Sequence, residues 1–223
     1  MALILNLETS TKNCSVGISK NGVCIALKEQ NDGQYSHAEK LHVFIEELLN
    51  EHQLKVTDLD AIAVGKGPGS YTGLRIGVSA AKGLAYAAEI PLISVHTLQV
   101  LANTVKPKEG LIIPILDARR MEVYAAIFTN NHQFKRQVQA EIIDQNSYGE
   151  LLDNHPIYFV GDAVDKCKEV LQHPNAIFIE NQFPSAKEMS ALSYAKFINK
   201  DFEDVAYFEP FYLKDFIVTP SKK

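Results

Sequence analysis

The sequence has few of the features that are typical of exported proteins, membrane proteins or proteins with a structural metal site. Its three cysteines, Cys14, Cys24 and Cys167, form no CxxC pair and leave one unmatched, so neither a disulfide framework nor a zinc site is indicated. The opening residues MALILNLETS lack a basic region, and no segment approaches the roughly 18 uninterrupted apolar residues of a membrane span. We therefore expect a cytoplasmic protein without membrane contact.

Positive charge is also scarce. The chain has 22 basic and 27 acidic residues, a net charge of -5, and no long Lys/Arg run beyond the SKK tail. Because phosphate neutralisation supplies most non-specific affinity for nucleic acids, this balance argues against tight nucleic-acid binding by this chain alone. The hydrophobic content of 46% in 223 residues is that of a globular protein with one large core or two small ones.

Hydrophobic periodicity shows the same order of elements twice. The first series predicts strands at 2–8, 14–20 and 22–30, a helix at 36–52, a strand at 60–65, a helix at 74–88, a strand at 91–95 and a helix at 96–105. The second series predicts strands at 111–118, 122–130 and 133–143, a helix at 146–152, a strand at 157–162, a helix at 163–172, a strand at 176–180 and a helix at 185–198. Turn pairs at Asn21-Gly22 and Asn130-Asn131 separate corresponding strands.

The repeated order βββαβαβα predicts an α/β protein with two lobes, 1–105 and 106–223, and a cleft between them. Each lobe would hold a mixed five-stranded sheet, an arrangement that resembles the actin, Hsp70 and sugar-kinase superfamily. In that superfamily the first turn of each lobe grips phosphates. The candidate residues for such turns here are Glu8, Thr9, Ser10, Thr11 and Asp117. The alternative, which we weight equally, is that these polar side chains only satisfy the backbone of tight turns.

The stretch GKGPGSYTGLRIG, from Gly65 to Gly77, joins a predicted strand to a predicted helix and could present amides to an anion. It fits neither nucleotide motif, because Gly73 is followed by Leu74 rather than by Lys and Ser/Thr, and the glycines give GxGxxxG. We therefore predict a structural loop with Ser70 or Thr72 as the helix N-cap.

Taken together, ETST, GPGSYTGLRIG, ILDARRMEVYAAIF and EPFYLKD closely resemble the bacterial TsaB (YeaZ) family over essentially the whole chain. The resemblance implies a part in placing a threonylcarbamoyl group on N6 of adenosine 37 in tRNAs that read codons beginning with A. It also implies pairing with the related catalytic subunit TsaD, with the ATPase TsaE joining the complex.

The sequence does not predict that this chain catalyses a reaction by itself. The catalytic relative resembles a metalloenzyme with an HxxxH helix, whereas His37 and His42 are five apart and diverge by about 140° on a helix, so no metal site is expected. Gly161-Asp162 stands where ATP-binding members of the superfamily have two glycines. We expect no cofactor on this chain, with ATP and a metal ion on partner subunits. The alternative is a free-standing ATP-dependent or glycopeptidase-like hydrolase, but Ser70 has no evident histidine partner.

The two first-lobe helices carry the predicted partner surface. Small and apolar residues line one face of each helix. They form a wider apolar arc than a helix usually needs to pack on one sheet. Some of these residues must nevertheless belong to the core. The predicted interface residues are His37, Leu41, Ile45, Leu48, Gly73, Gly77, Ala81 and Leu84. A homodimer, including one with a sensing role, would make the same demand on this surface. Contact with tRNA is expected only through the complex, with Lys214, Lys222 and Lys223 as a minor contribution.

Overall fold

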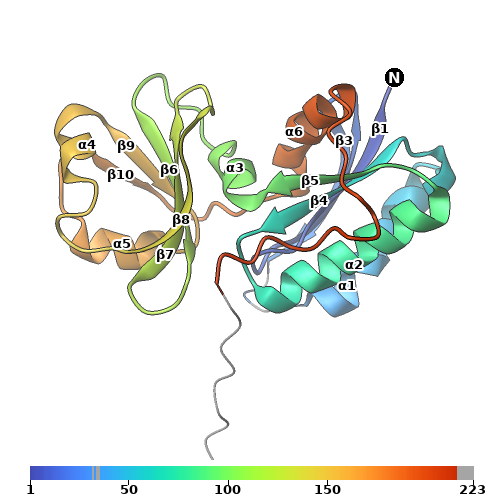
Figure 1. The fold of residues 1–223 in the computed structure, drawn as a ribbon, viewed down its shortest axis with the longest axis horizontal. Coiled ribbons are helices and arrows are strands. Elements are labelled where there is room, and N and C mark those ends of the chain that lie inside the picture. Colours follow the sequence, from blue (N-terminus) through green and yellow to red (C-terminus); the bar gives the residue numbers. More distant parts are fainter. Residues whose placement is uncertain (32, 34–35, 215–223) are drawn as a thin grey trace, which may run out of the picture.

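The computed structural model describes residues 1–31, 33 and 36–214, and it contains two five-stranded sheets side by side (Figure 1). The first lobe consists of β1 (Leu3–Glu8), β2 (Cys14–Lys20), β3 (Val23–Gln30), α1 (His37–Glu51), the 3₁₀ turn η1 (Val56–Asp58), β4 (Ala61–Gly67), α2 (Tyr71–Ala88), β5 (Leu92–His96) and α3 (Thr97–Ala102). The second consists of β6 (Leu111–Asp117), β7 (Glu122–Thr129), β8 (Phe134–Ile142), α4 (Gly149–Asn154), β9 (Ile157–Val160), α5 (Val164–Val170), β10 (Ala176–Ile179) and α6 (Ala186–Ile198).

The duplicated order βββαβαβα is therefore confirmed. The strand order is β3-β2-β1-β4-β5 in the first sheet and β8-β7-β6-β9-β10 in the second, so corresponding strands occupy corresponding places. In both sheets the first three strands are antiparallel and the last two run parallel to the first.

Local sequence signals account for several of the turns. Asn21 and Gly22 have φ values of 51° and 82°, the left-handed conformations of a tight hairpin between β2 and β3. The predicted turn at Asn130-Asn131 does join β7 to β8, but the residue with positive φ is His132, at 60°. Ser70 caps α2 as predicted, since its hydroxyl accepts the Gly73 amide at 3.3 Å.

The last helix of each lobe packs against the sheet of the other lobe, and α3 also contacts β4 and β5 of its own sheet. One face of the first sheet packs on α1 and α2, and the opposite face packs on α6, where Met189 lies among Ile4, Ala63 and Val95. One face of the second sheet packs on α4 and α5, and the other on α3, through Leu98 and Leu101. Figure 1 shows α6 above the first sheet and α3 between the two sheets. The lobe division at residue 105 remains a prediction. On either side of it, one helix packs on the sheet of the other lobe: α3 on the second sheet and α6 on the first.

Polar groups also join α6 to the first sheet. Asn6 of β1 is fully buried. Its side-chain Nδ2 donates to Ser19 Oγ at 3.0 Å, and its side-chain Oδ1 accepts from Ser193 Oγ at 2.7 Å. Because buried polar groups without partners are costly, this network specifies how α6 seats on the sheet.

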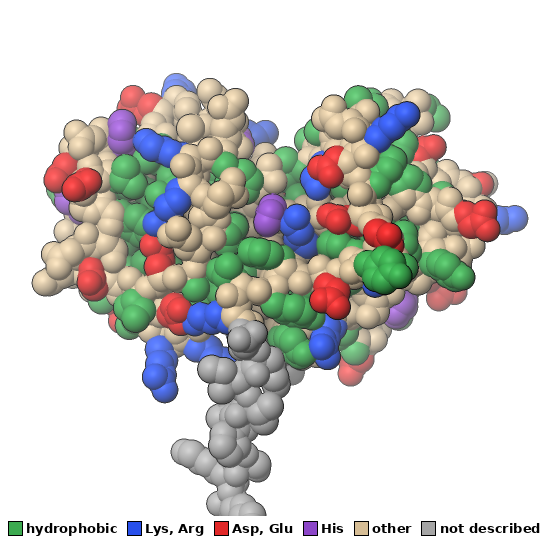
Figure 2. Space-filling model, viewed as in Figure 1, with side chains coloured by type: hydrophobic (Ala, Val, Ile, Leu, Met, Phe, Trp, Pro, Cys, Tyr) green, Lys and Arg blue, Asp and Glu red, His purple; other side chains and the backbone are tan. Residues whose placement is uncertain are grey.

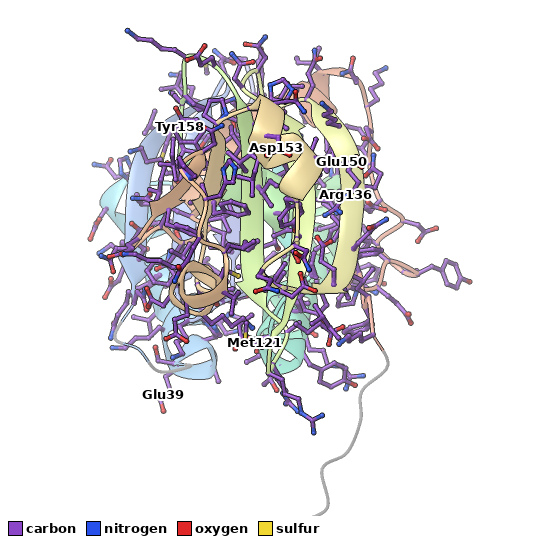
Figure 3. All side chains as sticks on the ribbon, turned by 90° about the vertical axis from the view of Figure 1, so that its left-hand side faces the viewer. Glu39, Met121, Arg136, Glu150, Asp153 and Tyr158 are labelled. Atoms are coloured by element: carbon purple, nitrogen blue, oxygen red, sulfur yellow. The ribbon has the colours of Figure 1, made fainter. Side chains whose placement is uncertain are left out.

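The outer face of the second lobe is covered by a separate polar and aromatic cluster. Arg136 of β8 forms a bidentate pair with Glu141, and the Tyr148 hydroxyl donates to the same carboxylate at 2.6 Å. The Tyr148 ring packs against Phe159 with centroids 5.6 Å apart. Figure 3 shows Arg136 on this face, with Glu150 and Asp153 on α4 above it. The contacts indicate a structural cover over the second core.

Candidate functional site

The first candidate turn lies between β1 and β2 and is filled by the chain itself. The Ser70 amide, in the glycine-rich loop, donates to Ser10 O at 2.7 Å, and Thr9 Oγ1 donates to Gly73 O at 2.8 Å. Thr9, Ser10 and Thr11 are all buried. A loop amide and the Thr9 hydroxyl, both suited to hold a phosphate, are therefore engaged within the protein.

The glycines of the loop and of α2 permit this close packing. A Cβ added at Gly69 would lie 2.4 Å from Ser10 O, and one at Gly73 would lie 2.1 Å from Thr9 O. At Gly77 it would lie 2.2 Å from Thr9 Oγ1. The absence of side chains on this part of α2 serves contact with the turn, because any side chain would overlap its backbone or hydroxyl.

Glu8 is buried at the start of the same turn. Its Oε1 accepts the Ser10 amide at 2.8 Å, whereas Oε2 has no hydrogen-bond partner in the described part of the chain. Burial raises the pKa of Glu8, and the hydrogen bonds from Ser10 oppose this rise. Gly65 on β4 lies so close that a Cβ there would come within 2.3 Å of Oε2. The neutral carboxylic acid is the form that this environment favours.

His37 ties α1 to the turn. Its Nε2 donates to Thr11 O at 2.7 Å, and burial lowers the pKa of the imidazole. Among the residues that the structure describes, no three His, Cys, Asp or Glu side chains are grouped so that they could hold a metal ion. His37 therefore has a structural contact of its own, distinct from metal binding.

The second candidate turn, between β6 and β7, is occupied by an ammonium group. Lys166 of α5 pairs with the exposed carboxylate of Asp117 and donates to Arg120 O at 2.9 Å and Glu122 O at 2.7 Å. The Asp117 amide donates to Asp162 Oδ1 at 2.8 Å. Lys166 and Asp117 thus pair with each other at this candidate turn, and the ammonium group is already held by one carboxylate and two carbonyl oxygens.

Gly161, of the Gly161-Asp162 pair after β9, has a backbone conformation that requires glycine. Its φ is 129°, and a Cβ there would lie 2.1 Å from Ile115 O, so the backbone itself requires glycine. The next residue, Asp162, is exposed and uses its side chain to hold the Asp117 amide.

Most of the predicted partner residues lie in the interior of the isolated chain. All of them except Leu84 are buried within the chain, where they pack on the first sheet or against the β1–β2 turn. The apolar arc was wide because α2 packs on both the sheet and this turn. The buried ones are listed here, and their part in an interface remains a prediction: His37, Leu41, Ile45, Leu48, Gly73, Gly77 and Ala81.

A shallow groove of about 600 Å³ remains between the outer faces of α1 and α2. Gly83 lies in it with open space around its Cα, so a side chain could be added there without a clash. The groove is mostly apolar in lining and is open to solvent. Its lining residues are Ala38, His42, Arg75, Ile76, Ser79, Ala80, Gly83 and Leu84.

The segment after α6, for which the sequence predicts no element, runs back along α2 (Figure 1). Lys82 donates to Ala206 O at 3.1 Å and Phe208 O at 2.9 Å, and Arg75 donates to the Tyr212 hydroxyl at 3.2 Å. Lys214 then reaches the second lobe and pairs with Glu122. Lys222 and Lys223 lie outside the described residues. The polar side of α2 is thus used to hold this segment.

His96, at the junction of the lobes, packs as a neutral ring. Its edge-to-face neighbours are Phe134 of the second lobe, at a centroid distance of 6.0 Å, and Phe211, at 5.6 Å. Burial, together with the charges of Lys66 and Lys196, lowers the pKa of His96 to about 4. At neutral pH it therefore contributes apolar packing between the lobes. Figure 2 shows a notch between the two lobes at the upper edge of the molecule.

The described residues include no helix with the length and apolarity that a bilayer crossing demands.

Comparisons with known proteins give consistent matches. A family model described as TsaD, tRNA N6-adenosine threonylcarbamoyltransferase, matches residues 31–219. The tRNA threonylcarbamoyladenosine biosynthesis protein TsaB of Bacillus subtilis is 33% identical over 76% of this chain and 75% of that protein. TsaB of Haemophilus influenzae is 26% identical over 95% and 93%. A tRNA N6-adenosine threonylcarbamoyltransferase of Bacillus thuringiensis is 37% identical over 42% of this chain and 32% of its own length.

A solved structure supports the fold. The structure of YeaZ from Pseudomonas aeruginosa superimposes with a TM-score of 0.82 at 24% identity and covers 96% of this chain and 100% of that one. Both lobes and their mutual arrangement are therefore shared with that protein.

Proposed function

Since the chain belongs to the TsaB (YeaZ) family, we propose that it is an accessory subunit in the biosynthesis of threonylcarbamoyladenosine in tRNA, without catalysis of its own. The absence of catalysis is supported by the contacts within the β1–β2 and β6–β7 turns. Buried Thr9 and Ser10 contacts fill the first, and the Lys166 ammonium fills the second. A nucleotide would have to displace these internal bonds, so we expect weak or no ATP binding by the isolated chain.

The partner we propose is a TsaD-like catalytic subunit, bound through the groove between α1 and α2. Subunits related by ancient duplication can pair through equivalent surfaces, which would give a pseudo-twofold contact of four helices. The support is the groove itself, whose exposed small residues would let the helices of a partner approach closely. A second copy of this chain could compete for the same surface, and a TsaE-like ATPase would join the assembled pair.

Reconstitution tests this proposal. The purified chain is incubated with tRNA, ATP and an activated threonylcarbamoyl donor, first alone and then with its TsaD-like partner, and modified adenosine is measured by mass spectrometry. We expect no product and no ATPase with the chain alone, and a large increase over the partner alone when both are present. Turnover by the lone chain that persists through repurification and metal chelation would contradict the accessory role.

The hydrolase alternative would need a nucleophile with a base or a metal-bound water. Ser70, the hydroxyl considered for that role, instead accepts the Gly73 amide as the N-cap of α2. Glu8, the buried acid nearby, is bound to the Ser10 amide. These contacts favour structural roles for both residues.

A further inference from the structure

The turn between β6 and β7 presents two adjacent arginines in an unusual conformation. Arg119 and Arg120 have φ values of 73° and 52°, and both are exposed. The left-handed region costs a residue other than glycine about 1 to 2 kcal/mol, and such strain persists only where the surroundings hold it. Asn or Gly would fit this turn with less strain, so the backbone alone does not account for two arginines here.

The turn is held rigidly. Ala118 N donates to Glu122 O at 3.1 Å, and Glu122 N donates to Arg119 O at 3.2 Å. Lys166 of α5 also binds two carbonyls of the same turn, those of Arg120 and Glu122. The two guanidinium groups therefore project from a fixed platform, which reduces the entropy that they would lose on binding a ligand.

The carboxylates near this turn are already engaged, whereas the arginines are not. Asp117 pairs with Lys166, Glu122 pairs with Lys214, and Asp162 accepts the Asp117 amide. Within the described ranges, neither Arg119 nor Arg120 donates a side-chain hydrogen bond or forms an ion pair.

Further cations lie at the same end of the molecule. Burial raises the pKa of Tyr124, and the charges of Lys214 and Arg119 oppose that rise, so both cations lie near it. Lys12 is exposed on the corresponding turn of the first lobe. Burial raises the pKa of Asp162, and the charge of Lys12 opposes that rise, so Lys12 lies near Asp162. Figure 2 shows basic side chains projecting from the lower edge of the second lobe, with acidic ones among them.

The position of the turn relates it to the proposed partner surface. Figure 3 shows Met121, the next residue of the turn, at the lower end of the second lobe, the end at which Glu39 of α1 lies. Figure 1 shows α1 and α2 along the lower side of the first lobe. A substrate held by a subunit bound at α1 and α2 would therefore be on the side of the molecule where the arginines project.

We propose that Arg119 and Arg120 bind the phosphate backbone of the tRNA while the partner subunit holds it. This inference rests on the proposed function. Guanidinium groups match phosphate oxygens in bidentate geometry, and such contacts position a nucleic acid without reading its sequence. Because the chain has a net charge of -5, two arginines add to the affinity of the complex but do not suffice for the isolated chain.

The test compares two double variants in the reconstituted complex. Arg119→Asn with Arg120→Asn removes both charges and keeps residues that tolerate positive φ. The matched control, Lys20→Asn with Lys106→Asn, removes two exposed charges, one at the end of β2 and one in the loop before β6. Fluorescence anisotropy gives the Kd for labelled tRNA across 50 to about 300 mM salt, a range in which counterion release is measurable. We expect the arginine variant to raise the Kd about ten-fold and to lower the salt slope by about 1 to 2, and the control to match wild type.

Partner binding is measured in parallel by calorimetry. Unchanged Kd and salt slope in a folded, fully assembled arginine variant would overturn the inference. So would loss of partner binding, which would make the turn a protein contact. If the wild-type chain does not stimulate tRNA modification, the proposed function itself is wrong. If the wild-type chain stimulates modification but the arginine variant binds tRNA as the wild type does, only the inference about the two arginines is wrong.

Discussion

At the scale of single residues, the contact between α2 and the β1–β2 turn depends on glycine. We expect Gly73→Ala to lower the free energy of unfolding by about 1 to 3 kcal/mol or more, because its Cβ would overlap the Thr9 carbonyl and the backbone would have to shift. Gly83→Ala in the same helix meets no atom within 4 Å and should raise stability by about 0.5 to 1 kcal/mol. Urea unfolding followed by circular dichroism measures both. Equal effects of the two substitutions would show that the close contact is unimportant.

Glu8 gives a pH dependence whose sign follows from its burial. Its pKa in the folded protein lies above the ordinary value of 4.5, so the native state binds more protons than the unfolded state, and this group lowers stability as pH rises from about 4.5 toward the folded pKa. Glu8→Gln keeps the shape and removes the titration. We expect the stability of the Gln variant relative to wild type to increase between pH 5 and pH 8 in urea unfolding. A constant difference across that range would mean that Glu8 is ionised in the native state.

The burial of the β1–β2 turn could not be predicted from the residues alone. Thr9, Ser10 and Thr11 have the hydroxyls of a phosphate turn and also those of a tight reversal, and the pattern does not distinguish the two. The glycines of α2 predicted a close approach but not its direction. They approach Thr9 within the chain, whereas we expected a second helix of a partner.

At the scale of elements, the groove between α1 and α2 is the part of the predicted interface that remains open. Gly83→Trp would fill it without disturbing the core, because Gly83 is exposed and has open space around it. We expect at least about ten-fold weaker binding of the TsaD-like partner, since overpacking a close contact typically costs about 1 to 3 kcal/mol. Calorimetry measures the affinity, and circular dichroism confirms folding.

The matched control for the groove is Ala191→Trp, on the exposed face of α6 at the other side of the first sheet. It adds the same side chain to an exposed small residue of a helix. Wild-type affinity in folded Gly83→Trp, or an equal loss in both variants, would direct the search for the interface to the second lobe.

Lys82 of α2 holds the C-terminal segment through two carbonyl acceptors, and Arg75 adds a contact with Tyr212. Lys82→Met should release residues 204–211 and accelerate hydrogen exchange at the Phe211 amide, which donates to Lys66 O at 2.8 Å. Hydrogen bonds from a charged donor contribute about 1.5 to 3 kcal/mol, so protection of this segment should fall by a factor of ten or more. Mass-spectrometric exchange measures it, with peptides of β1 and β4 as internal reference. Unchanged protection would show that the remaining contacts of Phe211, Tyr212 and Lys214 suffice to hold the segment.

The order of elements was predictable because each strand and helix has its own periodicity and turn residues. The exchange of α3 and α6 was not, because amphipathicity indicates that a helix has an apolar face but not which sheet covers it. The same limit explains the C-terminal segment, whose EPFYLKD residues have neither helical nor strand periodicity.

At the scale of the whole molecule, the exchanged helices should make the two lobes unfold as one unit. Met189 of α6 is fully buried against β1, β4 and β5 of the first sheet, yet α6 follows the last strand of the second. Met189→Ala should cost about 2 to 5 kcal/mol, and this loss should appear equally in both sheets because neither retains its full core once α6 or α3 leaves. Ile198→Ala, at an exposed position of the same helix, should cost less than about 0.5 kcal/mol.

Hydrogen exchange under increasing urea reports the two sheets separately. Peptides of β1 and β4 and peptides of β6 and β9 should lose protection at one common urea concentration in the wild type, and at one common lower concentration in Met189→Ala. If the second sheet kept its wild-type midpoint while the first lost protection early, the lobes would be independent domains divided near residue 105. Coupling through α3 and α6 would then be too weak to hold a partner surface on one lobe and a tRNA contact on the other in a fixed relation.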